Sequence, residues 1–201
     1  MRRALDLGVL DGAARGLGGR LEVAGLLRGQ LDRGRGVARA ARGAGVAVVA
    51  AQHAEREAAA TYPVSAARLA GWRDGLEAAG IAWEDVAREE RILNAPEQGA
   101  AGLRALLARD AGITAVLCST DQMALGALRA AAESGREDLS FVGYDDIPAA
   151  AAFDLATVRQ PLLEKGLTAG RLLVDPPEDP TPQEILLDVE LVPRGSARPV
   201  G

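Results

Sequence analysis

Positions 113–128, ITAVLCSTDQMALGAL, indicate the fold most clearly. The first six residues, 113–118, form a continuous apolar run of the kind that is buried on both faces of a parallel sheet. A helix is predicted over 122–132 with Gly135 as its stop, and a second apolar run, LSFVGY, follows at 139–144. A buried strand, a helix and another buried strand in succession predict a βαβ unit with parallel strands.

The same alternation continues on both sides of this unit. Further strands are predicted at 46–51, 86–93 and 185–192, and further helices at 65–79, 97–109 and 161–174. Ser65 is the expected N-cap of the first of these helices, and Gly80 is its expected C-terminal stop. Together these segments predict an α/β fold with a mainly parallel sheet built from βαβ units.

Composition excludes several classes of protein. The chain has 201 residues, 48% of them hydrophobic and 25% charged, which is ordinary for a globular protein. The single cysteine, Cys118, excludes a disulfide framework, and the single histidine leaves little for a histidine-based metal site. No apolar run is long enough to cross a membrane, and the net charge of −5 disfavours a globally basic nucleic-acid binder. Because the glycine-rich nucleotide motifs and the serine-hydrolase motif are absent, we expect no enzyme activity and no cofactor. The single cysteine and single histidine lead us to expect no metal.

The first 45 residues differ in composition from the rest of the chain. They contain nine Arg against four Asp or Glu, a local charge of +5, so that the remaining 156 residues carry −10. They also contain 11 of the 24 glycines, which disfavour helices. We interpret 1–45 as a poorly specified N-terminal segment, with a basic nucleic-acid-binding arm as the alternative.

Polar side chains follow the two central predicted strands. Thr120 and Asp121 come after the first of them, and Asp145 comes after the second. Because parallel sheets bind ligands beyond the carboxyl ends of their strands, Thr120 and Asp145 are candidate binding residues. Asp121 is interpreted as a structural cap of the following helix, and Asp146 as a turn residue. Arg68 lies in the first turn of its predicted helix, where a guanidinium group can face the same site.

Several segments carry a resemblance to a known family. They are SAARLAGW at 65–72, TAVLCSTDQMALGAL at 114–128, DLSFVGYDDIP at 138–148, ATVRQP at 156–161 and LVPRGS at 191–196. In residues, order and spacing they resemble the effector-binding domain of the LacI/GalR family of bacterial transcription regulators. The resemblance covers residues 46–198, which we therefore expect to form the sensor domain.

The resemblance implies a two-lobed fold like that of the periplasmic sugar-binding proteins. Most strands of the first lobe have no counterpart here, so we expect one lobe to be complete and the other truncated, with 158–183 belonging to the truncated lobe. The resemblance also implies that Arg68 contacts a sugar or nucleoside, that Thr120 binds ligand hydroxyls and that Asp145 accepts hydrogen bonds from sugar hydroxyls. Asn94 stands where many sugar-binding members of the family have an aromatic residue.

The expected function is that of a cytoplasmic, non-enzymatic sensor domain for a sugar or nucleoside, which controls DNA binding through closure of its lobes. The implied partners are this effector and a second copy of the chain in a homodimer. Operator DNA is expected to bind only through a helix-turn-helix headpiece that this sequence lacks, and no membrane is expected to bind. A periplasmic-type sugar-binding protein of a transporter and a non-functional fragment are the alternatives. The leucines of helix 161–174 predict an apolar face left exposed by the truncated lobe.

Overall fold

The computed structural model describes residues 45–51, 63–78, 80–175, 185 and 187–197, and their strands form one six-stranded sheet in the order β2-β1-β3-β4-β5-β6. The strands are β1 (Gly45–Ala51), β2 (Ala87–Arg91), β3 (Ile113–Cys118), β4 (Ser140–Asp145), β5 (Ala156–Arg159) and β6 (Glu190–Val192). β1 to β5 pair in parallel, and β6 pairs antiparallel with β5. The predicted α/β fold with a mainly parallel sheet is confirmed. The interpretation of residues 1–45 as a poorly specified segment falls, apart from Gly45, outside the described residues, and so does the single histidine, His53.

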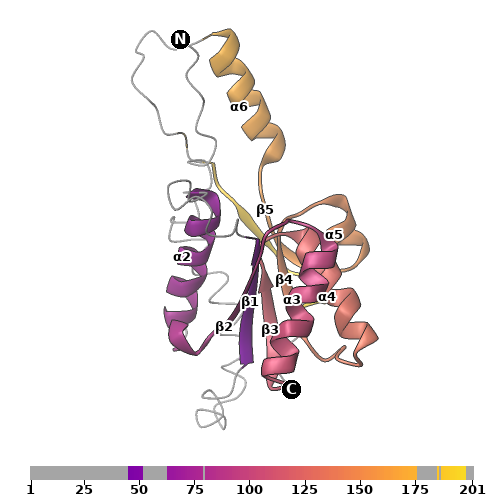
Figure 1. Cartoon of the computed structure of the whole chain (residues 1–201). Coiled ribbons are helices and arrows are strands. Elements are labelled where there is room, and N and C mark those ends of the chain that lie inside the picture. Colours follow the sequence, from indigo (N-terminus) through magenta and orange to yellow (C-terminus); the bar gives the residue numbers. More distant parts are fainter. Residues whose placement is uncertain (1–44, 52–62, 79, 176–184, 186, 198–201) are drawn as a thin grey trace.

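Helices cover both faces of this sheet. They are α2 (Pro63–Ala78), α3 (Pro96–Arg109), α4 (Asp121–Glu133), α5 (Pro148–Ala152) and α6 (Leu162–Val174), with a short 3-10 helix at Trp83–Asp85. In Figure 1, α2 lies on one face and α3, α4 and α5 lie on the other, whereas α6 projects away beyond the end of the sheet. The alternation of strand and helix thus produces a three-layer sandwich, as βαβ units require.

Alternate residues of the central strands enter two separate cores. Val49 on β1 packs with Leu103 and Met123 under α3 and α4, and all three are fully buried. The next residue toward the N-terminus, Val48, packs with Leu76 of α2 on the opposite face. Because both faces are covered, these strands read as continuous apolar runs in the sequence. The sheet therefore lies between the two helical layers, and the carboxyl ends of its strands are flanked by helices on both sides.

Some predicted boundaries are wrong. The helix predicted to begin after a cap at Ser65 begins at Pro63, so Ser65 lies inside α2. The strand predicted over 185–192 is reduced to the three residues of β6. β5, which is only four residues long, was not predicted as a strand from the apolar pattern. Segments as short as β5 and β6 carry too few residues for a recognisable periodicity.

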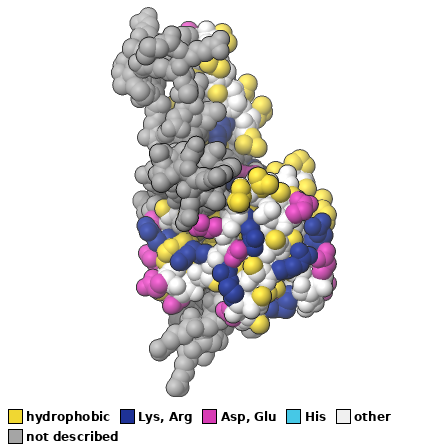
Figure 2. Space-filling view, viewed as in Figure 1, with side chains coloured by type: hydrophobic (Ala, Val, Ile, Leu, Met, Phe, Trp, Pro, Cys, Tyr) yellow, Lys and Arg dark blue, Asp and Glu magenta, His cyan; other side chains and the backbone are white. Residues whose placement is uncertain are grey.

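The exposed face predicted for helix 161–174 is confirmed in α6. None of its residues is buried, and Leu163, Leu173 and Val174 are 78%, 73% and 88% exposed. Figure 2 shows hydrophobic side chains along this projecting part of the molecule. A helix of 13 residues gains its stability mainly by packing its apolar face.

We expect the chain to self-associate at tens of micromolar, because water contact with this apolar face is unfavourable. The paired change Leu163→Gln and Leu173→Gln should lower the average mass measured by size-exclusion chromatography with light scattering. Glu164→Gln, a change at an exposed polar position of the same helix, should leave the mass unchanged. A wild-type chain that elutes as a uniform monomer would contradict this expectation.

Candidate ligand site at the carboxyl end of the sheet

The carboxyl ends of the parallel strands bring the predicted site residues to one end of the sheet. Thr120 follows β3 after one intervening residue, and Asp145 is the last residue of β4. Arg68 reaches the same end from α2, where its side chain is 12% exposed. β3 and β4 are neighbours in the sheet, so residues far apart in the sequence become neighbours in space.

Arg68 connects the ends of these two strands. Its Nη1 donates a hydrogen bond to the backbone oxygen of Ser119 at 2.7 Å. Its Nη2 lies 3.8 Å from Oδ1 of Asp145, whose side chain is 21% exposed. The guanidinium carbon lies 3.9 Å from the ring centroid of Tyr144, a cation–π distance. The structure therefore brings Arg68 and Asp145 together, as predicted.

Asp145 is held in an unusual backbone conformation. Its φ is 117°, a region that favours glycine, so the side chain and its neighbours must maintain it. Gln160 provides such a contact, since its Nε2 donates to Oδ1 of Asp145 at 2.6 Å. Gln160 follows β5 directly and was not predicted as a site residue. Its position after the unpredicted strand β5, within the ATVRQP segment, is the signal that could have found it.

Thr120 has the capping role that was predicted for Asp121. Thr120 is the N-cap of α4, and its Oγ1 accepts a hydrogen bond from the backbone N–H of Met123 at 3.3 Å. The same hydroxyl donates to Oδ1 of Asn94. Thr120 also lies next to Ser119, whose backbone oxygen accepts the hydrogen bond from Arg68. Its predicted contact with a ligand stays a prediction.

Asp121 is not the cap of α4, and its buried carboxylate instead joins three parts of the fold. Oδ1 accepts from the hydroxyl of Thr157 on β5 at 2.6 Å, and Oδ2 accepts from the backbone N–H of Ile147 at 2.9 Å. Burial raises the pKa of Asp121, and the hydrogen bonds from Thr157 and Ile147 oppose that rise. Both partners lie far along the chain, so the local pattern around a helix start could not indicate them.

Asp146 does lie in the turn expected of it, with a φ of 57°, but it is also the centre of an ion cluster. Its two oxygens accept from Arg159 Nε at 2.6 Å and from Arg194 Nη2 at 2.7 Å. Burial alone would raise the pKa of Asp146, but the two arginines outweigh burial and lower it. This cluster anchors the turn that follows Asp145.

We expect Asp146→Asn to lower the free energy of unfolding by about 1–2 kcal/mol near pH 7, because Arg194 is left with a weaker acceptor. The half-exposed Arg159 adds little, since water screens its charge. A carboxyl whose pKa is lowered on folding stabilises the fold above its unfolded pKa, about 4, and loses that effect as the pH falls through its folded pKa. Urea titrations should therefore show the difference shrinking below about pH 4.

The control is Asp154→Asn, at an exposed aspartate with a φ of 52°. A difference that persists undiminished at the lowest pH would contradict the assignment.

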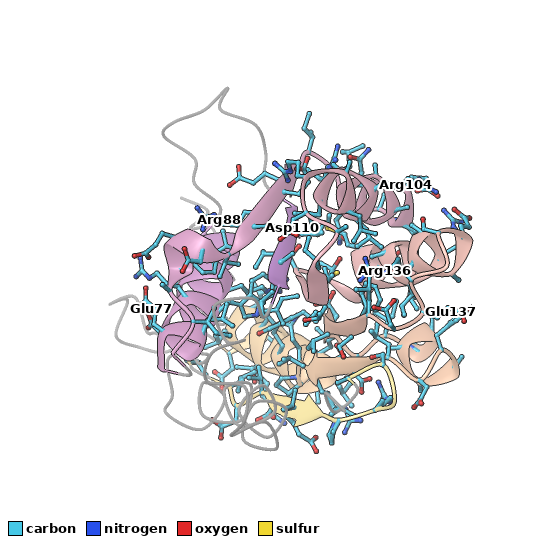
Figure 3. All side chains as sticks on the ribbon, turned by 90° about the horizontal axis from the view of Figure 1, so that it is seen from below. Glu77, Arg88, Arg104, Asp110, Arg136 and Glu137 are labelled. Carbon is cyan, nitrogen blue, oxygen red and sulfur yellow. The ribbon has the colours of Figure 1, made fainter. Side chains whose placement is uncertain are left out.

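The opposite end of the sheet is built differently. Figure 3 views the molecule from that end and labels Asp110 and Arg136 there. Arg136 donates to the backbone oxygens of Ala111 and Ile113 at 3.0 and 2.7 Å and pairs with Asp138 at 2.9 Å. These contacts satisfy backbone oxygens at the amino end of β3. In the part of the chain that the structure describes, no group of three or more His, Cys, Asp or Glu is placed to hold a metal, and no helix has the length and hydropathy needed to cross a membrane.

Comparison with known proteins places the chain in a family. Residues 41–197 match the periplasmic binding protein-like domain, and the chain belongs to this family. A HTH-type transcriptional regulator of Mycobacterium tuberculosis is 34% identical over 149 residues, which are 73% of this chain and 42% of that protein. The chain thus spans less than half the length of this relative. The resemblance to the LacI family, first seen in the sequence segments, is confirmed.

Two solved structures of regulators share the fold. The LacI-family regulator from Enterococcus faecium with bound ribose has a TM-score of 0.67 at 26% identity, covering 88% of this chain and 62% of that one. The regulator CelR in complex with cellobiose has a TM-score of 0.64 at 31% identity, covering 76% of this chain and 46% of that one. The described chain therefore corresponds to the effector-binding domain of a LacI-family transcriptional regulator, and these relatives are regulators rather than enzymes.

Proposed function

We propose that this chain is the non-enzymatic sensor part of a cytoplasmic transcriptional regulator and binds a sugar or nucleoside at the carboxyl end of its sheet. The observation that carries the proposal is the meeting of Arg68 with Asp145 beside the ends of β3 and β4. The solved relatives with ribose and with cellobiose support a polyhydroxylated effector.

The chemistry of the site suits such an effector. The Asp145 carboxylate accepts hydrogen bonds from hydroxyl groups, and the Arg68 guanidinium donates to ring or hydroxyl oxygens. Bonds that involve a charged partner are about twice as strong as bonds between neutral groups. Thr120 and Asn94 add a hydroxyl and an amide on the β3 side of the site.

Regulation follows from a shift between conformations. An effector that binds one arrangement of the lobes more tightly than another raises the population of that arrangement. In the longer relatives, which are HTH-type regulators, we propose that this shift changes how a homodimer presents its DNA-binding headpieces. The described segments form the sheet and its helices, and we propose that they do not themselves bind operator DNA sequence-specifically, because base readout needs an element that fits the major groove.

The test is isothermal titration calorimetry with ribose, glucose, cellobiose and a nucleoside. We expect at least one of these to bind, and Arg68→Ala or Asp145→Ala to weaken it about ten- to hundredfold, since each removes a charged hydrogen-bonding partner. Arg73→Ala, at an exposed arginine of the same helix, and Asp154→Ala are the matched controls and should leave affinity unchanged. A ligand whose affinity is unaffected by both site variants would show that the site is elsewhere.

A further inference from the structure

The carboxylate of Asp145 is connected to α6 by a short chain of polar side chains. Gln160 Nε2 donates to Asp145 Oδ1 at 2.6 Å, and Lys165 Nζ donates to Gln160 Oε1 at 3.3 Å. Lys165 lies in the first turn of α6, the helix with no buried residue. The contact between Lys165 and Gln160 therefore joins this projecting helix to the end of the sheet.

The two ends of the Gln160 amide are chemically opposite, and both are used. An amide that presented its oxygen to Asp145 would repel the carboxylate, whereas the amide N–H group attracts it. The ammonium of Lys165 binds the oxygen of the same amide and so turns the N–H group toward Asp145. Lys165 thereby favours the one amide orientation that supports the carboxylate.

Asp145 has particular need of this support. With a φ of 117°, its backbone is in a region that a non-glycine residue adopts only when its surroundings impose it. Arg68, which lies on α2, places its Nη2 3.8 Å from the same Oδ1 atom. The hydrogen bond from Gln160 and the ion pair with Arg68 come from different elements and meet at one oxygen, so rotation of the carboxylate would weaken both contacts.

We propose that Gln160 and Lys165 are positioning residues that orient the Asp145 carboxylate for its ligand and couple its orientation to α6. The proposal rests on the proposed function, since it assigns these residues to the same ligand site. Gln160 acts on Asp145 directly, and Lys165 acts only through Gln160. A change in the direction of α6 thus changes the orientation of the Asp145 carboxylate. Conversely, binding of a hydroxyl-bearing ligand to Asp145 changes the contact between Gln160 and Lys165, and through it the position of α6.

The first experiment needs no ligand. The side-chain amide of Gln160 is observed by nitrogen–proton NMR and assigned by its loss in Gln160→Met. Asp145→Asn and Lys165→Met should each shift this resonance, because each removes one of its partners. Arg171→Met, which removes another cation from α6, should leave it in place. The proposal would be overturned, whatever the ligand is, if Lys165→Met did not shift the Gln160 resonance or if Arg171→Met shifted it as much as Lys165→Met does.

The second experiment titrates ribose, glucose and cellobiose into the same variants. For a sugar that binds, Gln160→Met should weaken affinity about tenfold, the effect of losing one charge-assisted bond, and Lys165→Met should weaken it about threefold. The double variant should match Gln160→Met, since Lys165 acts through that amide, whereas a general effect on folding would add. Unchanged affinity in Gln160→Met overturns the positioning role alone. If no sugar binds while the NMR shifts appear, the proposed effector class is wrong, but the hydrogen-bonded connection from Asp145 through Gln160 to Lys165 is supported.

Discussion

Gly126→Ala is expected to destabilise the fold by about 3 kcal/mol, toward the upper end of what overpacking costs. Gly126 on α4 lies against Pro96 at the start of α3, and a Cβ there would stand 1.8 Å from the Pro96 oxygen. That oxygen belongs to the backbone, so it cannot rotate away as a side chain would. The two helices would have to separate, and their shared core with Leu103 and Met123 would open.

Urea unfolding measures this effect, with Gly71→Ala as its control. Gly71 is also helical, but a Cβ on it meets nothing within 4 Å. Alanine should therefore stabilise that helix by about 0.5–1 kcal/mol, because glycine is the poorer helix former. If both changes have the same small effect, α3 and α4 do not approach as closely as described.

Asp121→Ala is the second change with a large expected effect, a loss of about 3 kcal/mol. It leaves the buried hydroxyl of Thr157 and the N–H of Ile147 without their acceptor, and each such group costs about 1–3 kcal/mol. Part of that loss is offset, because the buried carboxylate is itself costly, as its raised pKa indicates. The substitution also leaves an empty space beside Gly143, because the Asp121 side chain packs so closely there that a Cβ on Gly143 would lie 2.2 Å from Oδ1 of Asp121.

The double variant Asp121→Ala with Thr157→Val separates this mechanism from simple loss of volume. Once the Thr157 hydroxyl is removed, one unsatisfied donor disappears, so the double variant should be less destabilised than the two single changes added together. Additive effects in urea unfolding would show that the Asp121–Thr157 bond does not carry the stabilisation. A loss below about 1 kcal/mol in Asp121→Ala would contradict the whole assignment.

Strongly apolar segments made the centre of this fold predictable. The run at 113–118 became β3 with both ends as predicted, and the helix predicted at 97–109 became α3 with one additional residue. Burial on both faces selects apolar residues at every position, which leaves a signal in the sequence itself. β5 has only four residues and lacked such a signal, and β6 pairs at the edge of the sheet, where fewer positions need to be apolar.

The candidate site was predictable to a similar extent. Asp145 could be placed at the site from the sequence because it follows a predicted strand of a parallel sheet, and the resemblance to the LacI family added Arg68. The cap of α4 was assigned to Asp121 instead of Thr120, since a local rule for helix caps does not show which of two adjacent polar residues has a distant partner. Gln160 was missed because it follows β5, whose four residues did not predict a strand and so did not indicate that Gln160 would stand at the carboxyl end of the sheet.

The most direct test of the central claim maps ligand contacts on the backbone. Ribose or cellobiose is titrated into the isotopically labelled chain, and amide shifts are followed by NMR. A binding site at the carboxyl end of the sheet predicts shifts at Ser119 and Tyr144 and none at Asp110 or Arg136, which lie at the opposite end (Figure 3). Saturable shifts confined to the amino end of the sheet or to α6, with Ser119 and Tyr144 unmoved, would contradict the claim.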